Sequence, residues 1–444
     1  MSQDLIVAKF GGSSVRDAGA MRNCAKLAIQ RKAHFIVTSA TQGTTDQLVS
    51  LCDLEGNWKS AQAIVKSIET RHLTIAEELQ SSAEVQKRVQ KYCDNLRSLA
   101  HGIYLLKDCS QKTRHRILCL GELLASTLLV ETFCNEGVDA RFVDARKILR
   151  TNDRYGRALP QISRTAELCK ENVILDAKTF LITQGFIGSC ESGSVTTLGR
   201  GGSDYSAALF AEALGAKHLE IWTDVSGVAT TDPRICPEAR PIKEMSFREA
   251  SELAAFGAKV LHPTTVWPSM RKGFPIFVGN TRAPEEGGTW IRSEVKDCPL
   301  IRAISLKNSQ SFLTISTPEM SQSYGFLAKV FDVFNKHELS IDTVTTSEIS
   351  IGVTIDECEL LDGGLVQELR TFGSVDIENN LSLVSIVGNG IRHTPGLLEK
   401  VLKAINGINL RSICGGASKH QMCFLVDSNQ AAECVQNIHR SFVS

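Results

Sequence analysis

Short runs of apolar residues alternate with longer helical patterns through the first two-thirds of the chain. Runs that are apolar along their whole length predict strands buried on both faces, and helices must cover such strands. The pattern is therefore typical of an α/β fold with a mostly parallel sheet, in which ligands lie at the carboxyl ends of the strands. The expected strands are residues 5–10, 35–39, 140–143, 180–186, 218–223 and 275–279, and the expected helices include residues 18–30, 118–134, 204–214 and 247–256.

Size, charge and cysteine usage exclude several classes of protein. The 444 residues are enough for about three folding units and a large core. Lys and Arg total 49, as do Asp and Glu, so no chain-wide basic field is available for nucleic acid or an anionic membrane. The 14 cysteines include no C-x-x-C pair and are expected to be reduced thiols. The N-terminus lacks a signal-peptide pattern, and the apolar run at 117–130 is expected to be too short to span a bilayer. We therefore expect a soluble cytoplasmic protein.

A glycine-rich turn, Lys9-Phe10-Gly11-Gly12-Ser13-Ser14, follows the first expected strand. Two glycines let backbone N–H groups approach an anion, and a helix N-terminus favours negative charge. Lys9 would add a positive charge for phosphate oxygens. The alternative is an ordinary strand-to-helix turn whose lysine extends into solvent, and the turn does not match the Walker P-loop pattern.

A second cluster, Gly199-Arg200-Gly201-Gly202-Ser203-Asp204, opens an apolar helix. Arg200 can bind a carboxylate or phosphate through two hydrogen bonds. Asp204 is a candidate to hold Mg²⁺ or to orient Lys9, with a simple helix-capping charge as the alternative. Folding alone does not readily explain two separate anion-binding loops, so the pair indicates a binding function.

Other charged residues lie near expected strand and helix ends. Thr223 and Asp224 end a strand, Arg234 follows in an Asp-Pro turn and Lys259 ends a helix, where each residue could meet a nucleotide or serve only locally. Glu122 lies in an apolar helix, where a carboxylate is costly unless it meets a cation. We expect a substrate ammonium group, with an internal Arg or Lys as the alternative. Glycine loops, lysines and an Asp suit phosphoryl transfer, which depends on positioning and charge neutralisation.

The last third of the chain has shorter elements and an internal repeat. Residues 281–300 contain two prolines and two adjacent glycines, which predict a linker or a domain-edge strand. Beyond them, residues 329–344 resemble residues 400–413, and each copy predicts a helix, a polar turn and a strand pair. Two βαββαβ units fit the remaining length. Residues 319–378 hold 12 acidic and 3 basic residues, which modestly favours a cationic ligand there.

Seven ordered motifs span the first part of the chain: KFGGSSV at 9–15, GE at 121–122, RTND at 150–153, TQGFIG at 183–188, TLGRGGSDY at 197–205, WTDV at 222–225 and FGAKVLHP at 256–263. With the repeats, they resemble the aspartate kinase family over essentially the whole chain. The resemblance implies an amino-acid-kinase-type three-layer α/β/α domain, with an open, mostly parallel sheet, at 1–290. Residues 291–312 would be a linker and the first strand of the second ACT unit, and 313–380 and 381–444 would be tandem ferredoxin-like ACT domains. Gly325-Phe326-Leu327 and the segment from Ser340 to Glu348 look most like the monofunctional, lysine-sensitive class.

The resemblance also implies roles for individual residues. Lys9 and Asp204 would be catalytic. ATP, which would bring Mg²⁺ without a separate protein metal site, would be bound by Lys9, Gly11, Gly12, Thr223, Asp224, Arg234, Lys259 and Val260. L-Aspartate would be bound by Thr45, Glu122, Arg200, Gly201, Gly202 and Ser203. Allosteric L-lysine would be bound by Met320, Ser323, Phe326, Leu327, Ser340, Ile341, Asp342, Thr346 and Glu348.

Two positions depart from the family pattern. Ala229 stands where the family usually carries an aromatic residue beside adenine, and Ser226 replaces the usual proline just before it. We expect stacking on the base to be lost there, with a consequence for nucleotide affinity or selectivity, while the catalytic set is complete.

The implied reaction is in-line attack of the aspartate β-carboxylate on the γ-phosphate of Mg·ATP, giving 4-phospho-L-aspartate. This is the first step of lysine, threonine and methionine biosynthesis, with feedback inhibition by L-lysine expected. The alternatives are a kinase for another amino acid and a catalytically silent ACT-type sensor, and threonine is an alternative effector. A homodimer or a dimer of dimers through the ACT domains is expected, with no nucleic-acid or membrane partner.

Overall fold

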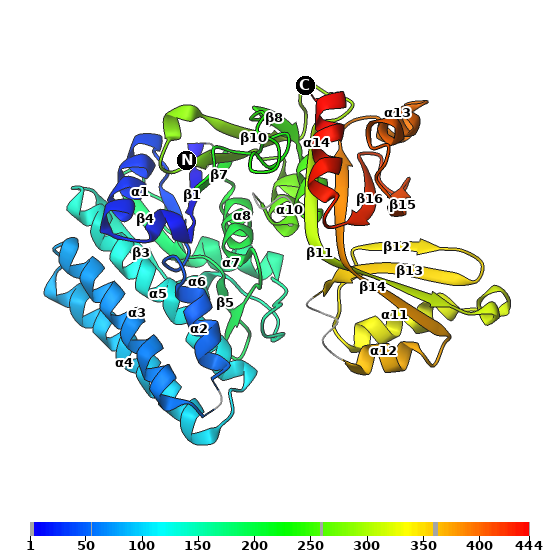
Figure 1. The fold of residues 1–444 in the computed structure, drawn as a ribbon. Coiled ribbons are helices and arrows are strands. Elements are labelled where there is room, and N and C mark those ends of the chain that lie inside the picture. Colours follow the sequence, from blue (N-terminus) through cyan, green and yellow to red (C-terminus); the bar gives the residue numbers. More distant parts are fainter. Residues whose placement is uncertain (1–3, 55, 258–260, 358–362, 444) are drawn as a thin grey trace. The chain divides into compact units, whose positions relative to one another are not determined.

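The structure, a computed structural model, describes every residue except 1–3, 55, 258–260, 358–362 and 444 (Figure 1). The chain folds into two compact units. The first comprises Met1–Val228, Pro241–Phe247 and Val260–Val295, and the second comprises Ala229–Arg240, Arg248–Lys259 and Lys296–Ser444. Two short segments from the expected kinase range therefore group with the second unit.

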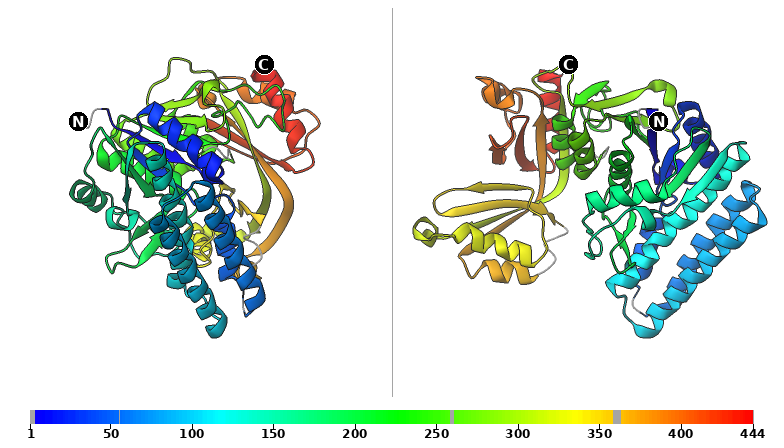
Figure 2. Two further views of the ribbon diagram at one scale, coloured as in Figure 1. Left: turned by 90° about the vertical axis from the view of Figure 1, so that its left-hand side faces the viewer. Right: turned by 180° about the vertical axis from the view of Figure 1, so that it is seen from behind.

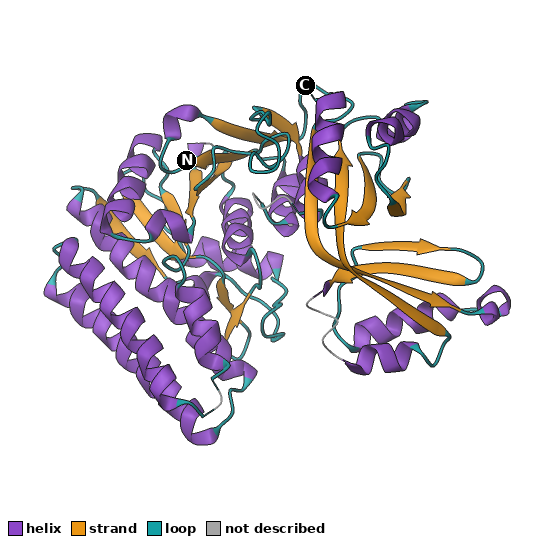
Figure 3. Ribbon diagram, in the orientation of Figure 1, coloured by secondary structure: helices purple, strands orange, loops and turns teal. Residues whose placement is uncertain are grey.

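An eight-stranded sheet forms the centre of the first unit (Figure 3). Its strand order is β3-β4-β2-β1-β7-β9-β10-β8, and all pairs are parallel except β9 with β10. Helices pack on this sheet, so the expected α/β class is confirmed. The strands are β1 (Ile6–Phe10), β2 (Phe35–Thr38), β3 (Asp139–Val143), β4 (Thr179–Gln184), β7 (His218–Thr223), β8 (Glu244–Ser246), β9 (Ile276–Asn280) and β10 (Gly288–Arg292), and β5 (Ile187–Ser189) with β6 (Val195–Thr197) makes a separate hairpin.

Strand β10 decides between the two alternatives for residues 281–300. The Pro- and Gly-rich pattern predicts a linker or a domain-edge strand, and the structure has a strand there, which lies inside the sheet between β9 and β8. Thr289 and Ile291 are fully buried. A Cβ on Gly288 would lie 2.1 Å from the carbonyl oxygen of Val278, so this glycine permits the close backbone approach rather than marking a loop.

Three long helices, α3, α4 and α5, lie side by side in the first unit (Figure 2). The sequence pattern did not indicate α3 or α4. Asn57 and Ser82 cap them by accepting hydrogen bonds from Ser60 N and Val85 N, a start signal visible in the sequence. The helices of this unit are α1 (Ala18–Arg31), α2 (Thr44–Cys52), α3 (Trp58–Glu78), α4 (Ala83–Leu106), α5 (Gln111–Asn135), α6 (Ala145–Ile148), α7 (Ile162–Asn172), α8 (Gly202–Leu214) and α10 (Pro263–Lys272).

Helix α5 is longer than the apolar run at 117–130 suggests. It has 25 residues, and it is the one helix in the described part of the chain that is long and apolar enough to cross a membrane. The expectation that this segment is too short was therefore wrong. However, 83% of its apolar window is buried inside the protein, where it packs against α2, α4, β3 and β4. Core packing accounts for its composition.

A six-stranded antiparallel sheet forms the second unit, in the order β12-β13-β11-β14-β16-β15. Helices α11 and α12 share one apolar cluster with β11 and β13, and α13 and α14 share another with β14 and β16. The elements are β11 (Ala303–Ser316), β12 (Thr343–Thr346), β13 (Ser350–Asp356), β14 (Ser374–Val387), β15 (Leu410–Gly415) and β16 (Gln421–Asp427), with α9 (Phe247–Ala255), α11 (Phe326–Lys336), α12 (Gly363–Leu369), α13 (Leu397–Ala404) and α14 (Ala431–Phe442).

The two repeats share strands β11 and β14, which are 14 residues long. Residues 310–316 of β11 pair with β13, whereas residues 303–307 pair only with residues 383–387 of β14. The register shifts between these halves, after Lys307. The strand segment that precedes the first repeat therefore completes the sheet that contains the second.

Candidate functional site

Strand β1 delivers Lys9 to the carboxyl edge of the parallel sheet. Lys9 lies opposite Val37 of β2 and Ile221 of β7, so it stands between two flanking strand ends. The following turn is tied down because Gly11 N donates to the carbonyl oxygen of Trp222, at 3.1 Å. A Cβ on Gly11 would lie 3.5 Å from Lys9 Nζ. The first glycine turn therefore presents its backbone beside the lysine ammonium group.

Lys9 forms a short ion pair with Asp204, with Nζ 2.5 Å from Oδ1. The two side chains are only 10% and 16% exposed. Asp204 lies in the first turn of α8, which begins after Gly201 in a left-handed conformation (φ 71°). The fold thus joins the two glycine clusters, 190 residues apart in sequence, through their charged members.

The second glycine cluster is packed so tightly that side chains would not fit. A Cβ on Gly201 would lie 2.3 Å from the Cβ of His262, and one on Gly185 would lie 2.7 Å from the Cβ of Ser203. His262 caps α10 by accepting from Thr264 N, which is a structural role. Its position against Gly201 is a contact that the sequence did not indicate. Burial lowers the pKa of His262, so the ring beside the loop is neutral.

Glu122 of α5 is a buried carboxylate, 2% exposed. Its Oε1 accepts from Ala40 N at 3.4 Å, and its Oε2 has no hydrogen-bond partner. No Lys or Arg in the described ranges forms an ion pair with it, so the alternative of an internal cation is not supported. Burial raises the pKa of Glu122 to about 8. The site therefore holds an acid that needs a cation before it can ionise at neutral pH.

Residues 39–44, called the 39–44 loop, comprise the connection between β2 and α2 and the first residue of α2. This loop links Glu122 to the first glycine turn. Gln42 N donates to the carbonyl oxygen of Gly12 at 3.1 Å. A Cβ on Gly12 would lie 2.9 Å from the carbonyl oxygen of Ala40, and one on Gly121 would lie 2.9 Å from the Cβ of Ala40. Thr45, in the first turn of α2, is half-buried at the end of this loop.

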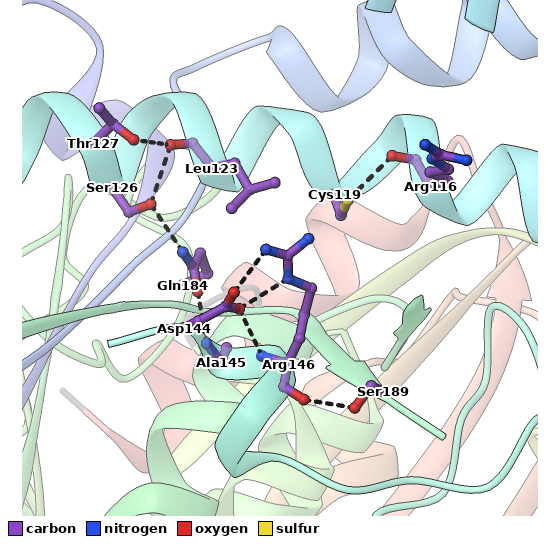
Figure 4. A network of polar contacts seen from close by, with 10 residues as sticks. All are labelled: Arg116, Cys119, Leu123, Ser126, Thr127, Asp144, Ala145, Arg146, Gln184 and Ser189. Carbon is purple, nitrogen blue, oxygen red and sulfur yellow. Dashed lines mark hydrogen bonds and ion pairs between the residues drawn. The ribbon is translucent and has the colours of Figure 1, made fainter. Parts of the chain in front are cut away.

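Helix α5 is held against the sheet edge by a polar network (Figure 4). Gln184, fully buried at the end of β4, donates to Ser126 of α5 at 3.2 Å and accepts from Ala145 N at 2.8 Å. Asp144 caps α6 and holds Arg146, whose carbonyl oxygen accepts from Ser189. The glutamine of the TQGFIG motif thus fixes the helix that carries Glu122.

The remaining nucleotide candidates fall into three groups. Thr223 and Asp224 help to line a cavity of about 420 Å³, together with Ser13, Arg16 and Arg282. Arg234 belongs to the second unit, is exposed, and pairs with Asp232 at 2.6 Å. Lys259 and Val260 lie outside the described residues.

The aspartate candidates Arg200, Gly202 and Ser203 belong to the second glycine cluster, where Arg200 is exposed.

The two positions that depart from the family pattern belong to different units. Ser226, in the first unit, bonds to Glu286 at 2.5 Å and to Asn280 at 3.2 Å, so its hydroxyl holds the turn that a proline would otherwise stiffen. Ala229 begins a segment of the second unit and is half-buried.

The expected effector residues surround the start of α11 and the strand β12 in the second unit. Asp342, just before β12, is paired with Lys307 of β11, whose Nζ lies 2.5 Å from Asp342 and 2.9 Å from Asp356. Burial raises the pKa of Asp342 despite this partner. The other residues of the set are mostly exposed or half-buried: Met320, Ser323, Leu327, Ser340, Ile341, Thr346 and Glu348, with Phe326 buried.

Among the described residues, no group of three or more His, Cys, Asp or Glu side chains is arranged to hold a metal ion. A mostly parallel sheet with two glycine loops, a buried Lys–Asp pair and a buried carboxylate defines a kinase of the amino acid kinase class, followed along the chain by an ACT-type regulatory unit.

Comparison with known proteins agrees with this class and narrows it. Residues 4–280 match the amino acid kinase family, and residues 384–442 match the ACT domain. The chain is 40% identical to the lysine-sensitive aspartokinase 3 of Escherichia coli (strain K12), over 98% of both chains. It is 33% identical to the chloroplastic aspartokinase 1 of Arabidopsis thaliana, over 98% of this chain and 80% of that one. The chain belongs to the aspartokinase family.

Two solved structures match almost the whole chain. Escherichia coli aspartokinase III in complex with aspartate and ADP (R-state) matches with a TM-score of 0.91 at 38% identity, over 99% of this chain and 100% of that one. The same enzyme in complex with lysine and aspartate (T-state) matches with a TM-score of 0.83 at 39% identity, with the same coverage.

Substitution of Gly121 in α5 tests whether the close contact with the 39–44 loop matters for stability and activity. Gly121→Ala would force a Cβ within 2.9 Å of Ala40 and 3.3 Å of Leu48 Cδ1. We expect a loss of about 1–3 kcal/mol of stability from overpacking. We also expect at least about a tenfold drop in kcat/KM for aspartate, because the helix that carries Glu122 is displaced from the loop. Urea unfolding and steady-state kinetics measure both quantities.

Gly102→Ala is the matched control, since Gly102 lies in α4 with no atom within 4 Å of an added Cβ. It should gain up to about 1 kcal/mol of stability and keep normal kinetics. Wild-type stability and kinetics for Gly121→Ala would show that the close contact does not constrain the site.

Proposed function

We propose that this chain uses the described site to transfer the γ-phosphoryl group of ATP to the β-carboxylate of L-aspartate, producing 4-phospho-L-aspartate and ADP. Two observations carry the proposal: the ion pair of Lys9 with Asp204 beside the first glycine turn, and the buried Glu122, which accepts from Ala40 in the loop packed on Gly12. Lys9 supplies positive charge for a transferring phosphoryl group, and Glu122 supplies a negative partner for an amino acid. A kinase for an N-acylated amino acid would have no ammonium group for Glu122 to bind.

The reaction needs charge neutralisation more than proton transfer. The β-carboxylate of aspartate is already ionised at neutral pH, so its oxygen attacks the γ-phosphorus directly while the bond to the β,γ-bridging oxygen breaks. The barrier comes from bringing two anions together. Lys9, held by Asp204, and the backbone N–H group of Gly12 offset that repulsion without reorganising during the reaction. No general base is required.

Binding of aspartate is proposed to use opposite charges on two elements. The α-ammonium group pairs with Glu122, and the α-carboxylate pairs with the exposed guanidinium of Arg200. Gly201, Gly202, Ser203 and Thr45 complete the pocket. Because an acyl phosphate hydrolyses readily, the close packing of Gly201 on His262 helps by limiting the entry of water on that side.

ATP is proposed to arrive with Mg²⁺, held mainly by the phosphates. Mg²⁺ prefers oxygen ligands and usually takes one or two carboxylates besides phosphate oxygens. The donor set fits this mode, since Asp204 is a carboxylate at the site and the described residues form no larger acidic cluster. The ion would neutralise charge on the phosphates. Thr223, Asp224, Arg234, Lys259 and Val260 are the proposed nucleotide contacts, without stacking at Ala229.

Regulation by L-lysine is proposed for the first ACT unit. The acidic character of residues 319–378 and the half-buried carboxylate of Asp342 favour a cationic ligand. The similar Escherichia coli enzyme has been crystallised with lysine and aspartate, which supports the proposal.

We also propose a homodimer, or a dimer of dimers, that assembles through the ACT units. The exposed apolar side chains of Leu327, Leu398 and Leu402 on α11 and α13 support it. A cytoplasmic location is proposed from the free, mostly buried cysteines among the described residues.

Lys9→Ala tests the catalytic proposal. We expect kcat to fall by at least about 100-fold, because one preorganised positive charge at the transferring group is lost. Trapping the acyl phosphate as aspartyl hydroxamate, with ADP release in parallel, measures the rate. Lys26→Ala, at an exposed lysine of α1, is the control. A near-normal kcat for Lys9→Ala would remove Lys9 from the mechanism.

The raised pKa of Glu122 predicts a pH dependence. Below its pKa of about 8 the free enzyme carries a neutral Glu122, which binds an ammonium group poorly. The value of kcat/KM for aspartate should therefore rise from pH 6 toward pH 8 and then level off. Glu122→Gln should lose this rise and lower kcat/KM by about 10–100-fold. A profile that is the same in both enzymes would contradict the assignment.

The effector proposal predicts inhibition by L-lysine that depends on Asp342. Asp342→Asn should raise the half-inhibitory concentration of lysine by about tenfold or more, because a charged hydrogen bond is weakened. Asp332→Asn, at an exposed acid of α11, should respond as the wild type does. The measurement is the kinase rate at increasing concentrations of lysine or threonine. Stronger inhibition by threonine than by lysine, or a lysine response of Asp342→Asn equal to that of the wild type, would overturn the proposal.

A further inference from the structure

The loop that joins Glu122 to the glycine turn is held by a buried chain of side chains that reaches helix α3. Thr41 Oγ1 lies 2.6 Å from Thr44 Oγ1 and 3.1 Å from His72 Nε2. His72 Nδ1 lies 2.7 Å from the carbonyl oxygen of Ile68. At the other end, Arg71 Nη1 lies 3.0 Å from Thr44 Oγ1 and 2.9 Å from the carbonyl oxygen of Gln42. Thr41, Thr44 and His72 are all at most 1% exposed.

Chemistry dictates the direction of every hydrogen bond in this side-chain network. A carbonyl oxygen only accepts, so His72 Nδ1 carries the proton and donates to Ile68. The ring is neutral, since burial lowers the pKa of His72 to about 4, and Nε2 must therefore accept. The Thr41 hydroxyl then donates to His72 and accepts from Thr44. The Thr44 hydroxyl, having donated, accepts from Arg71, which can only donate.

This hydrogen-bond network ends on the part of the loop that faces the amino-acid side of the site. Ala40, next to Thr41, donates its N–H to Glu122, and Thr45 follows Thr44 directly. The phosphate side of the loop has supports of its own, because Ser39 N donates to Phe10 O and Gln42 N donates to Gly12 O, both at 3.1 Å. Loss of the side-chain network would loosen Thr41 and Thr44, and with them the neighbouring Ala40 and Thr45, while these backbone bonds persist.

We infer that His72 is a positioning residue for aspartate, acting through Thr41 and Thr44 on the loop that supports Glu122 and Thr45. The inference rests on the proposed aspartate site, and His72 itself touches none of the proposed substrate contacts. No sequence motif includes His72, because α3 lies between the motif at the first glycine turn and the motif at Glu122. A histidine suits this place because one neutral ring both donates on one side and accepts on the other.

The test compares variants that break or restore the hydrogen bond from Thr41 to His72. His72→Phe keeps the ring but removes both nitrogens, and Thr41→Val removes the hydroxyl with almost no change in shape. Each should raise KM for aspartate by about tenfold, with KM for ATP within about twofold of normal. His72→Gln restores an acceptor oxygen near the place of Nε2 and should recover most of the affinity. The double variant His72→Phe/Thr41→Val should be no worse than the poorer single variant, because both break one chain.

His101→Phe provides the matched control, since His101 is an exposed helical histidine of the same unit that contacts Trp58 and Tyr104. It should leave both KM values unchanged. Circular dichroism and thermal unfolding establish that each variant is folded, and Thr41→Val carries the test if His72→Phe is not.

Three results would overturn the inference. They are a folded Thr41→Val with a normal KM for aspartate, an equal rise in KM for aspartate and ATP, and strictly additive effects in the double variant. Failure of the proposed function is distinguishable, because the wild type would then form no ATP-dependent aspartyl hydroxamate.

Discussion

Burial of charge at the carboxyl edge of the parallel sheet governs the architecture of the first unit. Lys9 and Asp204 offset each other's desolvation by pairing at 2.5 Å, which requires the ends of β1 and α8 to meet. Glu122 has no such partner in the described structure, and burial instead raises its pKa to about 8. Around these groups, a Cβ on Gly12, Gly121 or Gly201 would lie within 2.9 Å of a neighbouring atom, so these three glycines leave no room for a side chain.

The second unit depends on a different constraint, the sharing of strands between two repeats. Strands β11 and β14 run through both halves, so neither half has a closed sheet of its own. Lys307, at the register shift of β11, holds Asp342 and Asp356 of the first repeat. A ligand that engages Asp342 therefore acts on a residue already tied to a strand of the other half. This arrangement provides a physical route by which effector binding can alter the shared sheet.

Much of the fold and the chemistry followed from local pattern. Continuous apolar runs identified six strands of the central sheet, and Lys9, Asp204 and Glu122 stood out as charges in glycine-rich or apolar surroundings. The pattern did not indicate α3, although Asn57 marks its start. It left residues 281–300 as either a linker or a domain-edge strand, because Gly288 looks like a loop residue. His72 and Thr41 carried no signal at all. Their importance comes from a hydrogen-bond chain between segments about 30 residues apart, which no local pattern encodes.

Residue order along short stretches is enough to predict the class of fold, the two glycine-rich turns, the repeat in the tail and the family resemblance. The pairing of charges depends instead on the folded chain. Asp204 pairs with Lys9 and Asp342 with Lys307, whereas Glu122 has no cation partner among the described residues. These outcomes depend on burial and on distances between segments remote in sequence. A pKa and an ion pair are properties of the folded surroundings, not of the residue.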